Sequence, residues 1–362
     1  MSQVVDAGIA GLKNLGNSCY QNSVMQCLFG AVPLVRFFMG GEFRNHINRD
    51  NPMGHGGKVA QSFFKLVLDM KRNAGSSVAP VSFRDMLGDV APHYATRDQH
   101  DSQEFLTFLL DSLHEDLKRP LDPGARLPPS DNDDLESIPD VAEAARIAWA
   151  RYMVRNSSVI SQIFQGQLRS ELQCSTCGTR SVSYSTFSTL SVPVPGGARA
   201  RAPVHLEDCL REFVRPQVLD GDNAWRCPRC KVARSAIKSM AITKFPSVLI
   251  VHLMRFSFDG PFRNKIDRLV EFPIRGLALQ PTGRPTAAKY DLFAAGNHYG
   301  GLDGGHYTAI VRHGSDWHYF DDSRVSKCSE SEIVTNAAYT LFYVCRGSPE
   351  AQVLGVESGH KL

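Results

Sequence analysis

The stretch "NHYGGLDGGHYTAIVRHGSDWHYFDDSRV", residues 297–325, contains two runs of apolar and β-branched residues around a short polar turn. This pattern predicts two antiparallel strands joined by a hairpin. If Gly314 and Ser315 form a two-residue loop, His313 lies opposite Asp316, and the pairing of every other residue follows from that register. The stretch therefore predicts an antiparallel sheet in the C-terminal part of the chain.

The predicted register brings a histidine and a carboxylate together. His306 lies opposite position 323, and Asp321 is two residues earlier on the same face, which makes it a diagonal neighbour within side-chain reach. A loop one residue longer would reverse the faces and favour Asp322 instead. His298 is a competing base in the same stretch, but this register gives it no carboxylate partner. The hairpin thus predicts a His306–Asp321 pair.

The first third of the chain is predicted to be helical. Apolar residues recur at helical spacing in three segments, and Pro33 is expected to end the first of them. In the third segment, Asp101 stands three residues before a glutamate, which is a capping-box pattern. The three segments are residues 18–32, 61–73 and 101–120.

From about residue 163 the sequence changes to short β-type runs, which continue to Cys345. The amphipathic segment 205–214 predicts one short helix among them. Residues 120–140 are rich in proline and aspartate and predict an exposed loop or insertion. The expected fold class is α+β, with a helical N-terminal lobe followed by an antiparallel, β-rich C-terminal lobe.

Composition narrows the function classes. The chain has 362 residues and 40.0 kDa, with 43% hydrophobic and 21% charged residues and a net charge of +3. This charge indicates neither a nucleic-acid groove nor a membrane surface, and no apolar run is long enough to span a bilayer. Nine cysteines cannot all pair in disulfides. We therefore expect a reduced, cytoplasmic protein. We also expect no organic cofactor.

Two C-x-x-C pairs predict a metal site. Cys174 and Cys177 form the first pair, Cys227 and Cys230 the second, and 49 residues lie between the pairs. Zn²⁺ takes four thiolates tetrahedrally, and each short spacer lets two sulfurs face one ion. Four cysteines leave no water position, so the zinc would be structural. Two disulfides, or four unrelated buried thiols, are the alternative; a nucleic-acid-binding zinc ribbon would need a more basic surface.

The segment "NLGNSCYQNS", which begins at Asn14, has the features of a nucleophile site. Ser18 and Gln21 match a capping box, which would make Cys19 the first residue of a helix. The positive end of the helix dipole favours a thiolate there. Gly16 can supply the backbone angles of a tight turn, and the Asn14 amide could face developing oxyanion charge.

The alternative is that Cys19 is a small packing residue, as we expect for Cys27 further along the same helix. A nucleophilic cysteine needs a base and a group that orients the base, which His306 and Asp321 can supply. Four glycines within six residues precede His306, so another backbone could approach closely there; a merely flexible loop is the alternative. These glycines are Gly300, Gly301, Gly304 and Gly305.

Six segments of the chain, in the same order, resemble the ubiquitin-specific proteases, a family of cysteine-protease deubiquitinases. Small departures occur at Gln21, His100 and Met254, where the family usually has methionine, glutamine and lysine. None of them affects a candidate catalytic residue or zinc ligand. The segments are "GLKNLGNSCYQNSVMQCL", "HDSQEFLTFLLDSLHEDL", "FQGQLRSELQCSTCG", "WRCPRC", "SVLIVHLMRF" and the region from "YDLFAAGNHYGG" to "AAYTLFYV".

The resemblance implies a papain-like triad in which Cys19 is the nucleophile, His306 the base and then the acid, and Asp321 the orienting group. It assigns Asn14 to the oxyanion hole, and Asp322 matches an acidic position that often assists the triad.

The resemblance also implies a narrow channel for the diglycine tail of ubiquitin, formed by Gly304, Gly305 and Tyr307. Asp101 falls where the family has an acidic residue near that tail, although a helix cap explains this aspartate equally well. The Cys174, Cys177, Cys227 and Cys230 set matches the zinc site of the family's fingers.

The implied layout is a catalytic domain over residues 11–346, with a thumb at about 11–160, fingers and palm at about 161–346, and a polar tail at 347–362. The expected substrates are ubiquitin conjugates, and the expected state is a monomer. A protease for another ubiquitin-like modifier, a catalytically silent ubiquitin-binding module and a general papain-like peptidase are the rival functions.

Overall fold

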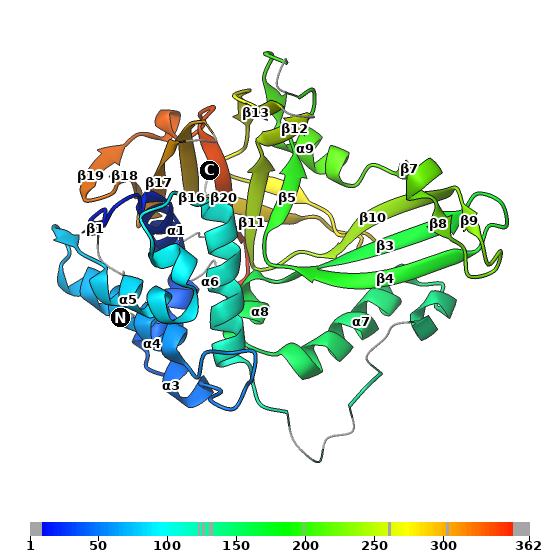
Figure 1. The fold of residues 1–362 in the computed structure, drawn as a ribbon, viewed down its shortest axis with the longest axis horizontal. Helices are drawn as coiled ribbons and strands as arrows, with labels where there is room; N and C mark the ends of the chain where they lie inside the picture. The colour runs from blue at the N-terminus through cyan, green and yellow to red at the C-terminus, as the bar shows by residue number, and fades with distance from the viewer. Residues whose placement is uncertain are drawn as a thin grey trace.

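The computed structural model describes residues 9–121, 124, 127–129, 133–197, 200–259, 262–301 and 304–349. Helices gather on one side of a large sheet, and a second sheet extends away from it on the other side (Figure 1). The predicted tail at 347–362 lies almost wholly outside the described residues. Within them, no single helix is long and apolar enough to cross a bilayer; only α1 and α2 together reach that length, bent by 84° at their junction.

The N-terminal part is helical, as predicted, but Pro33 does not end a helix. The helix α1 ends at Gly30, and Pro33 lies in the first turn of α2, where its missing N–H is not needed. The helices are α1 (Cys19–Gly30), α2 (Val32–Met39), α3 (Phe43–His46), α4 (Lys58–Arg72), α5 (Val81–Val90), η1 (Pro92–Ala95), α6 (Ser102–Leu117), η2 (Asp133–Ser137), α7 (Val141–Asn156) and α8 (Val159–Phe164).

The large sheet has the order β19-β18-β17-β16-β20-β11-β5, with β15 also paired to β16. All of its pairs are antiparallel except β5 with β11, so this lobe is predominantly antiparallel, as expected, with one parallel pair at this edge. Its strands are β5 (Leu190–Pro193), β11 (Val248–Met254), β15 (Leu277–Leu279), β16 (Ala288–Gly300), β17 (Gly305–His313), β18 (Asp316–Asp321), β19 (Arg324–Cys328) and β20 (Ala338–Cys345).

The hairpin register is confirmed. His313 pairs with Asp316 across β17 and β18, and Ala309 pairs with Phe320, as the two-residue loop requires. A loop longer by one residue would have moved every side chain of β18 to the other face of the sheet. The local turn therefore decides which acidic residue faces His306.

The second sheet has the order β4-β3-β10-β7 and carries the cysteine loops. The predicted helix at 205–214 is α9 (Leu206–Phe213). Its strands are β3 (Gly166–Cys174), β4 (Arg180–Phe187), β7 (Gln217–Leu219) and β10 (Ala236–Lys244). Four short pairs of strands are separate from both sheets: β1 (Gly11–Leu12) with β2 (Ser77–Val78), β6 (Val204–His205) with β14 (Val270–Glu271), β8 (Trp225–Arg226) with β9 (Ala233–Arg234), and β12 (Phe256–Asp259) with β13 (Phe262–Lys265). Two further 3-10 turns are η3 (Gly221–Asn223) and η4 (Glu330–Glu332).

Two buried clusters cover the large sheet. One contains α1, α4 and α6 with residues of β17 and β20, so α1 packs directly on the strand that carries His306. The other lies around α9, β5 and β11. The described part of the 120–140 stretch is not all exposed loop, because Leu135 of η2 is buried against Ala144 and Ala148 of α7.

Candidate active site

The loop before α1 is tight, and the capping-box prediction for it is wrong. Gly16 has φ +103°, a conformation that glycine adopts readily, which confirms its expected role in the turn. Ser18 is at the N-cap position but makes no side-chain cap; its Oγ accepts from the N–H of Leu15 at 2.8 Å. Gln21 turns away, and its Nε2 donates to the Tyr94 carbonyl at 2.7 Å.

Cys19 is the first residue of α1, as expected, but it is not an activated thiol in this conformation. The residue is only 3% exposed, and burial raises the pKa of its thiol. The backbone N–H of Tyr307 lowers that pKa, while the negative charge of Asp322 raises it. The effect of burial on the Cys19 pKa is larger than that of the N–H groups at the helix start, which were expected to stabilise the thiolate. Cys27 is fully buried in the core, as predicted for a packing residue.

His306 and Asp321 form the contact that the hairpin register predicts. Asp321 Oδ1 lies 2.6 Å from Nε2 of His306. The side chain of Asp321 is 36% exposed and that of His306 is 42% exposed. A carboxylate there accepts the Nε2 proton and fixes the imidazole tautomer. Nδ1 is then the ring nitrogen available to exchange a proton with another group.

Asp322 has a separate set of partners. It has φ +52° in the β18–β19 turn, and its carboxylate accepts from Asn14 Nδ2 at 2.9 Å and from Asn22 Nδ2 at 2.7 Å. The Asn14 Oδ1 accepts from the N–H of Gly16 at 2.9 Å. These bonds fix which end of the Asn14 amide is the donor and leave one of its two N–H bonds for a further acceptor. Asp322 therefore positions the amide that the sequence assigned to an oxyanion.

His298, the competing base, is a packed residue. The residue is only 3% exposed, and burial lowers the pKa of its imidazole to about 4. The ring lies against Phe256, Tyr307 and Tyr339. A Cβ at Gly305 would come within 2.2 Å of the His298 Nε2, so this glycine is required by the ring beneath it.

A cavity of about 570 Å³ lies beside β17, and its lining includes Gly305, Tyr307 and Asp101. Asp101 caps α6 through the N–H of Gln103 at 2.6 Å, and its second oxygen accepts from the Tyr339 hydroxyl at 2.5 Å. Asp101 therefore both caps the helix and lines the cavity.

No described neighbour requires a glycine at position 304, because a Cβ there would meet nothing within 4 Å; the Gly304 carbonyl accepts from the N–H of Gly301 at 3.1 Å. Sequence reasoning missed Asn22 and Tyr339. Asn22 lies three residues after Cys19 on the same helix, which is a usable signal, whereas Tyr339 lies in the quoted segment "AAYTLFYV" without a predicted role.

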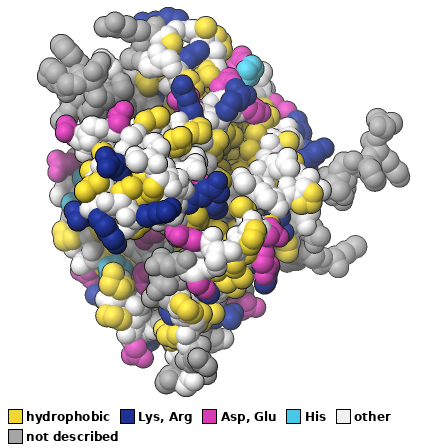
Figure 2. All heavy atoms as spheres, turned by 90° about the vertical axis from the view of Figure 1, so that its right-hand side faces the viewer, with side chains coloured by type: hydrophobic (Ala, Val, Ile, Leu, Met, Phe, Trp, Pro, Cys, Tyr) yellow, Lys and Arg dark blue, Asp and Glu magenta, His cyan; other side chains and the backbone are white. Residues whose placement is uncertain are grey.

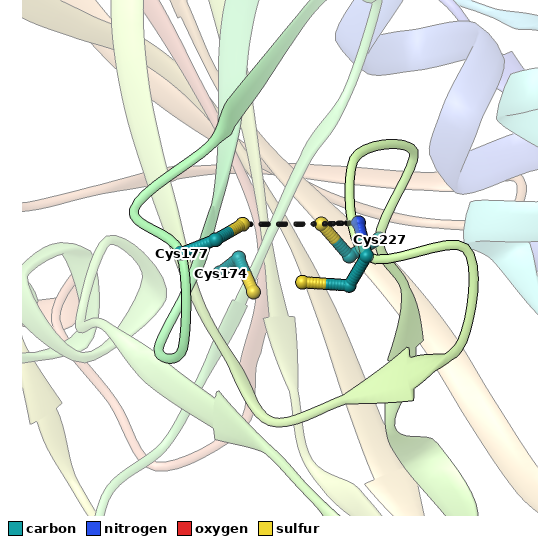
Figure 3. A group of neighbouring side chains, drawn as sticks. Cys174, Cys177 and Cys227 are labelled. Atoms are coloured by element: carbon teal, nitrogen blue, oxygen red, sulfur yellow. Dashed lines mark hydrogen bonds between the residues drawn. The ribbon is translucent and has the colours of Figure 1, made fainter.

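The four predicted metal ligands lie together at the end of the second sheet. The sulfurs of Cys174, Cys177, Cys227 and Cys230 all lie within 4.8 Å of one another. Figure 3 shows the labelled cysteines turned toward a common point between two loops. The Cys177 and Cys227 sulfurs are 3.5 Å apart, too far for a disulfide, so the disulfide alternative does not hold.

The two cysteine loops have the same hydrogen-bond pattern. The N–H of Gly178 donates to the Cys174 carbonyl at 3.0 Å, and that of Lys231 donates to the Cys227 carbonyl at 2.9 Å. Both donors have positive φ, +69° and +63°. Two matching turns that converge their sulfurs fit a tetrahedral thiolate ligand set.

Comparison with known protein families and curated proteins gives consistent matches. A family model described as ubiquitin carboxyl-terminal hydrolase matches residues 10–343. The chain is 37% identical over 347 residues to ubiquitin carboxyl-terminal hydrolase 2 of Bos taurus, covering 94% of this chain and 56% of that protein. It is 36% identical over 368 residues to ubiquitin carboxyl-terminal hydrolase 4 of Vanderwaltozyma polyspora, covering 92% and 40%. The chain thus spans about half the length of these relatives or less.

Solved structures share the fold. The chain matches a structure of the yeast SAGA DUB module with a TM-score of 0.69 and 25% identity, covering 96% of this chain and 70% of that one. A second match, to the SAGA DUB module of Ubp8, Sgf11, Sus1 and Sgf73 bound to monoubiquitin, has a TM-score of 0.70 and 23% identity, covering 95% and 71%.

Proposed function

The chain belongs to the ubiquitin carboxyl-terminal hydrolase family, and on that basis we propose that it is a deubiquitinase acting as a thiol protease. The reaction is hydrolysis of the peptide or isopeptide bond after the C-terminal glycine of ubiquitin. The 2.6 Å contact between His306 and Asp321, on the strand that packs against the Cys19 helix, is the observation that carries the proposal. It provides a base held in one orientation by a carboxylate, on a strand that contacts the helix of Cys19.

In the first half of the reaction, the thiol proton of Cys19 passes to Nδ1 of His306, and the sulfur attacks the glycine carbonyl. The Asn14 amide donates to the oxyanion that forms. His306 then protonates the departing lysine amine, and the C–N bond breaks to leave a thioester. In the second half, His306 activates water, which releases ubiquitin and restores the thiol.

Cys19 must become accessible for this reaction, because the residue is only 3% exposed here and burial raises the pKa of its thiol. Substrate binding that draws the sulfur out of its buried position would lower that pKa. The proposal therefore includes a rearrangement at the channel when the ubiquitin tail enters.

A folded substrate needs a large docking surface, because a diglycine tail has no side chains to recognise. Figure 2 views the molecule from the end of the second sheet, where hydrophobic side chains gather in a hollowed region with Lys and Arg side chains beside it. We propose the surface between the second sheet and the helices, the fingers, palm and thumb of the family, as the ubiquitin site.

We also propose that the four cysteines hold one Zn²⁺ with a structural role. When bound, the ion would cross-link the two loops through four thiolates and leave no position for water or substrate. The described cysteines are all free thiols, which supports a reducing compartment such as the cytoplasm. We propose a monomeric catalytic domain.

The decisive experiment uses a fluorogenic reporter attached to the C-terminus of ubiquitin. We expect release of the fluorophore by the wild-type protein and its abolition by Cys19→Ala. No release by the wild type, or full activity of Cys19→Ala, would overturn the mechanism. Electrophilic C-terminal probes of ubiquitin and of its relatives, offered in competition, separate a deubiquitinase from a protease for another ubiquitin-like modifier.

A further inference from the structure

The side chain of Gln99 is paired with the backbone of Gly305. The Gly305 N–H donates to Oε1 of Gln99 at 2.8 Å, and Nε2 of Gln99 donates to the Gly305 carbonyl at 2.9 Å. A primary carboxamide carries the same donor and acceptor as a peptide group. Gln99 therefore engages Gly305 as one residue of a neighbouring strand would.

The pairing occupies an open edge of β17. On one side, β17 pairs with β16 from its first residue, Gly305, to Val311. On the other side, β18 pairs only with Ala309 to His313. In the part of the chain that the structure describes, the residues of β17 before Ala309 consequently have no strand neighbour on that side, and the Gln99 amide fills the first position of this edge.

Cys19 lies further along the same edge. Backbone groups of alternate residues point to the same side of a strand, so the N–H of Tyr307 points in the same direction as the N–H and carbonyl of Gly305. The helix that carries Cys19 packs on β17, and the Tyr307 N–H is close enough to the Cys19 thiol to lower its pKa. The Gln99 amide and the nucleophile thus occupy consecutive positions of one strand edge.

An extended peptide whose carbonyl carbon reaches Cys19 must lie along this edge, and the edge offers it unpaired backbone groups, as in strand addition. The groups that it would pair with at Gly305 are the two that Gln99 holds. We propose that the Gln99 carboxamide is a built-in mimic of the substrate main chain, which closes the edge in the free enzyme and which the ubiquitin tail displaces. This inference rests on the proposed function.

The surroundings allow such a displacement. Gln99 is exposed, in the segment between η1 and α6, and both of its bonds to Gly305 are accessible to water. The cavity of about 570 Å³ is lined by Gln99 and Gly305 together. In a conjugate, folded proteins flank the diglycine at both ends. The diglycine therefore cannot be threaded through the channel end first and must enter it from the side. A side-chain bridge across the entrance must therefore open in each turnover.

The test compares Gln99→Ala and Gln99→Met with the wild type on the fluorogenic ubiquitin reporter. Methionine keeps the length of glutamine but lacks both hydrogen-bonding groups. Because the closed state reduces the fraction of competent enzyme, we expect both variants to lower KM by roughly 3- to 10-fold with kcat unchanged. Gln162→Ala, an exposed glutamine on α8, is the matched control and should leave KM unchanged.

The outcomes separate the two proposals. A wild type that does not cleave the reporter contradicts the deubiquitinase function itself. An active wild type with an unchanged or raised KM in both Gln99 variants overturns the mimic, because the amide would then not compete with substrate. A lowered kcat overturns it as well, and assigns Gln99 to positioning the backbone beside His306.

Discussion

Asp321 Oδ1 lies 2.6 Å from Nε2 of His306, across a hairpin whose two-residue loop joins His313 to Asp316. The contact joins residues 15 positions apart and depends on the loop between them, because a change in the loop would change which side chain faces the imidazole. The His306–Asp321 pair is therefore determined by a turn that lies several residues away from it.

The substitution Asp321→Asn tests the orienting role. An amide can present N–H groups to Nε2 and so favour the tautomer whose Nδ1 is protonated and cannot act as a base. We expect kcat on the ubiquitin reporter to fall by about 10²- to 10⁴-fold. Asp316→Asn on the same strand, whose carboxylate binds Lys327 at 2.6 Å on the surface, is the control and should keep full activity. Equal rates for the two variants would contradict the assignment.

The substitution Asn14→Ala tests the oxyanion donor. Removal of one such donor typically lowers kcat by about 10²- to 10³-fold, and KM should change little. Because Asn14 also accepts from the backbone of the loop, Tm should be measured alongside. Asn156→Ala, at the end of α7, serves as the control. A variant with a raised KM and an unchanged kcat would place Asn14 in substrate binding instead.

The substitution Asp322→Asn should change the pKa of Cys19 and the rate of reporter hydrolysis for two different reasons. The negative charge of Asp322 disfavours the Cys19 thiolate, so its removal should lower the pKa of Cys19. The pH at which iodoacetamide alkylation of Cys19 becomes half-maximal should shift downward. Reporter hydrolysis should nevertheless fall, because the asparagine replaces an acceptor that holds both Asn14 and Asn22. An upward shift of the alkylation midpoint would show that this charge does not act on the thiol.

The buried histidines should make the fold acid-sensitive. Burial lowers the pKa of His252 and of His298 to about 4, below the ordinary 6.5. The unfolded chain then binds more protons than the folded chain between these values, so stability is lost as the pH falls from 6.5 toward 4. Urea unfolding at about pH 6.5 and about pH 5 should differ by about 2 to 4 kcal/mol. His252→Gln should flatten this dependence, and a stability unchanged over the range would contradict it.

Removal of metal tests the cysteine cluster. Treatment with a strong chelator, or the substitution Cys227→Ser, should release zinc and lower Tm, because a metal bound only by the folded state stabilises it. A colorimetric zinc assay on denatured protein measures the metal content directly. Cys209→Ser, a buried cysteine outside the cluster, controls for general loss of packing and should keep its zinc. A metal-free protein with an unchanged Tm would rule out the structural role.

Local patterns explain much of what could be predicted. The cysteine spacing identified four sulfurs that come together, and the alternating residues around Gly314 identified the partner of His306. Both depend on short-range geometry, because a two-residue spacer and a hairpin register place side chains irrespective of the rest of the fold.

Other features could not be predicted because they join distant parts of the chain. The Asn14–Asp322 hydrogen bond spans 308 positions, and the pairing of Gln99 with Gly305 spans 206. The expected cap at Ser18 failed because its hydroxyl and the Gln21 amide found nearer or stronger partners in the folded loop.

By itself, then, the sequence determined the α+β class, the hairpin register, the two cysteine pairs and the helix start at Cys19, since each depends on residues close together in the chain. Only the tertiary structure decided the state of that cysteine. Its pKa depends on burial beneath segments nearly three hundred residues away and on the charge of Asp322, and desolvation is a property of the assembled fold rather than of any local pattern.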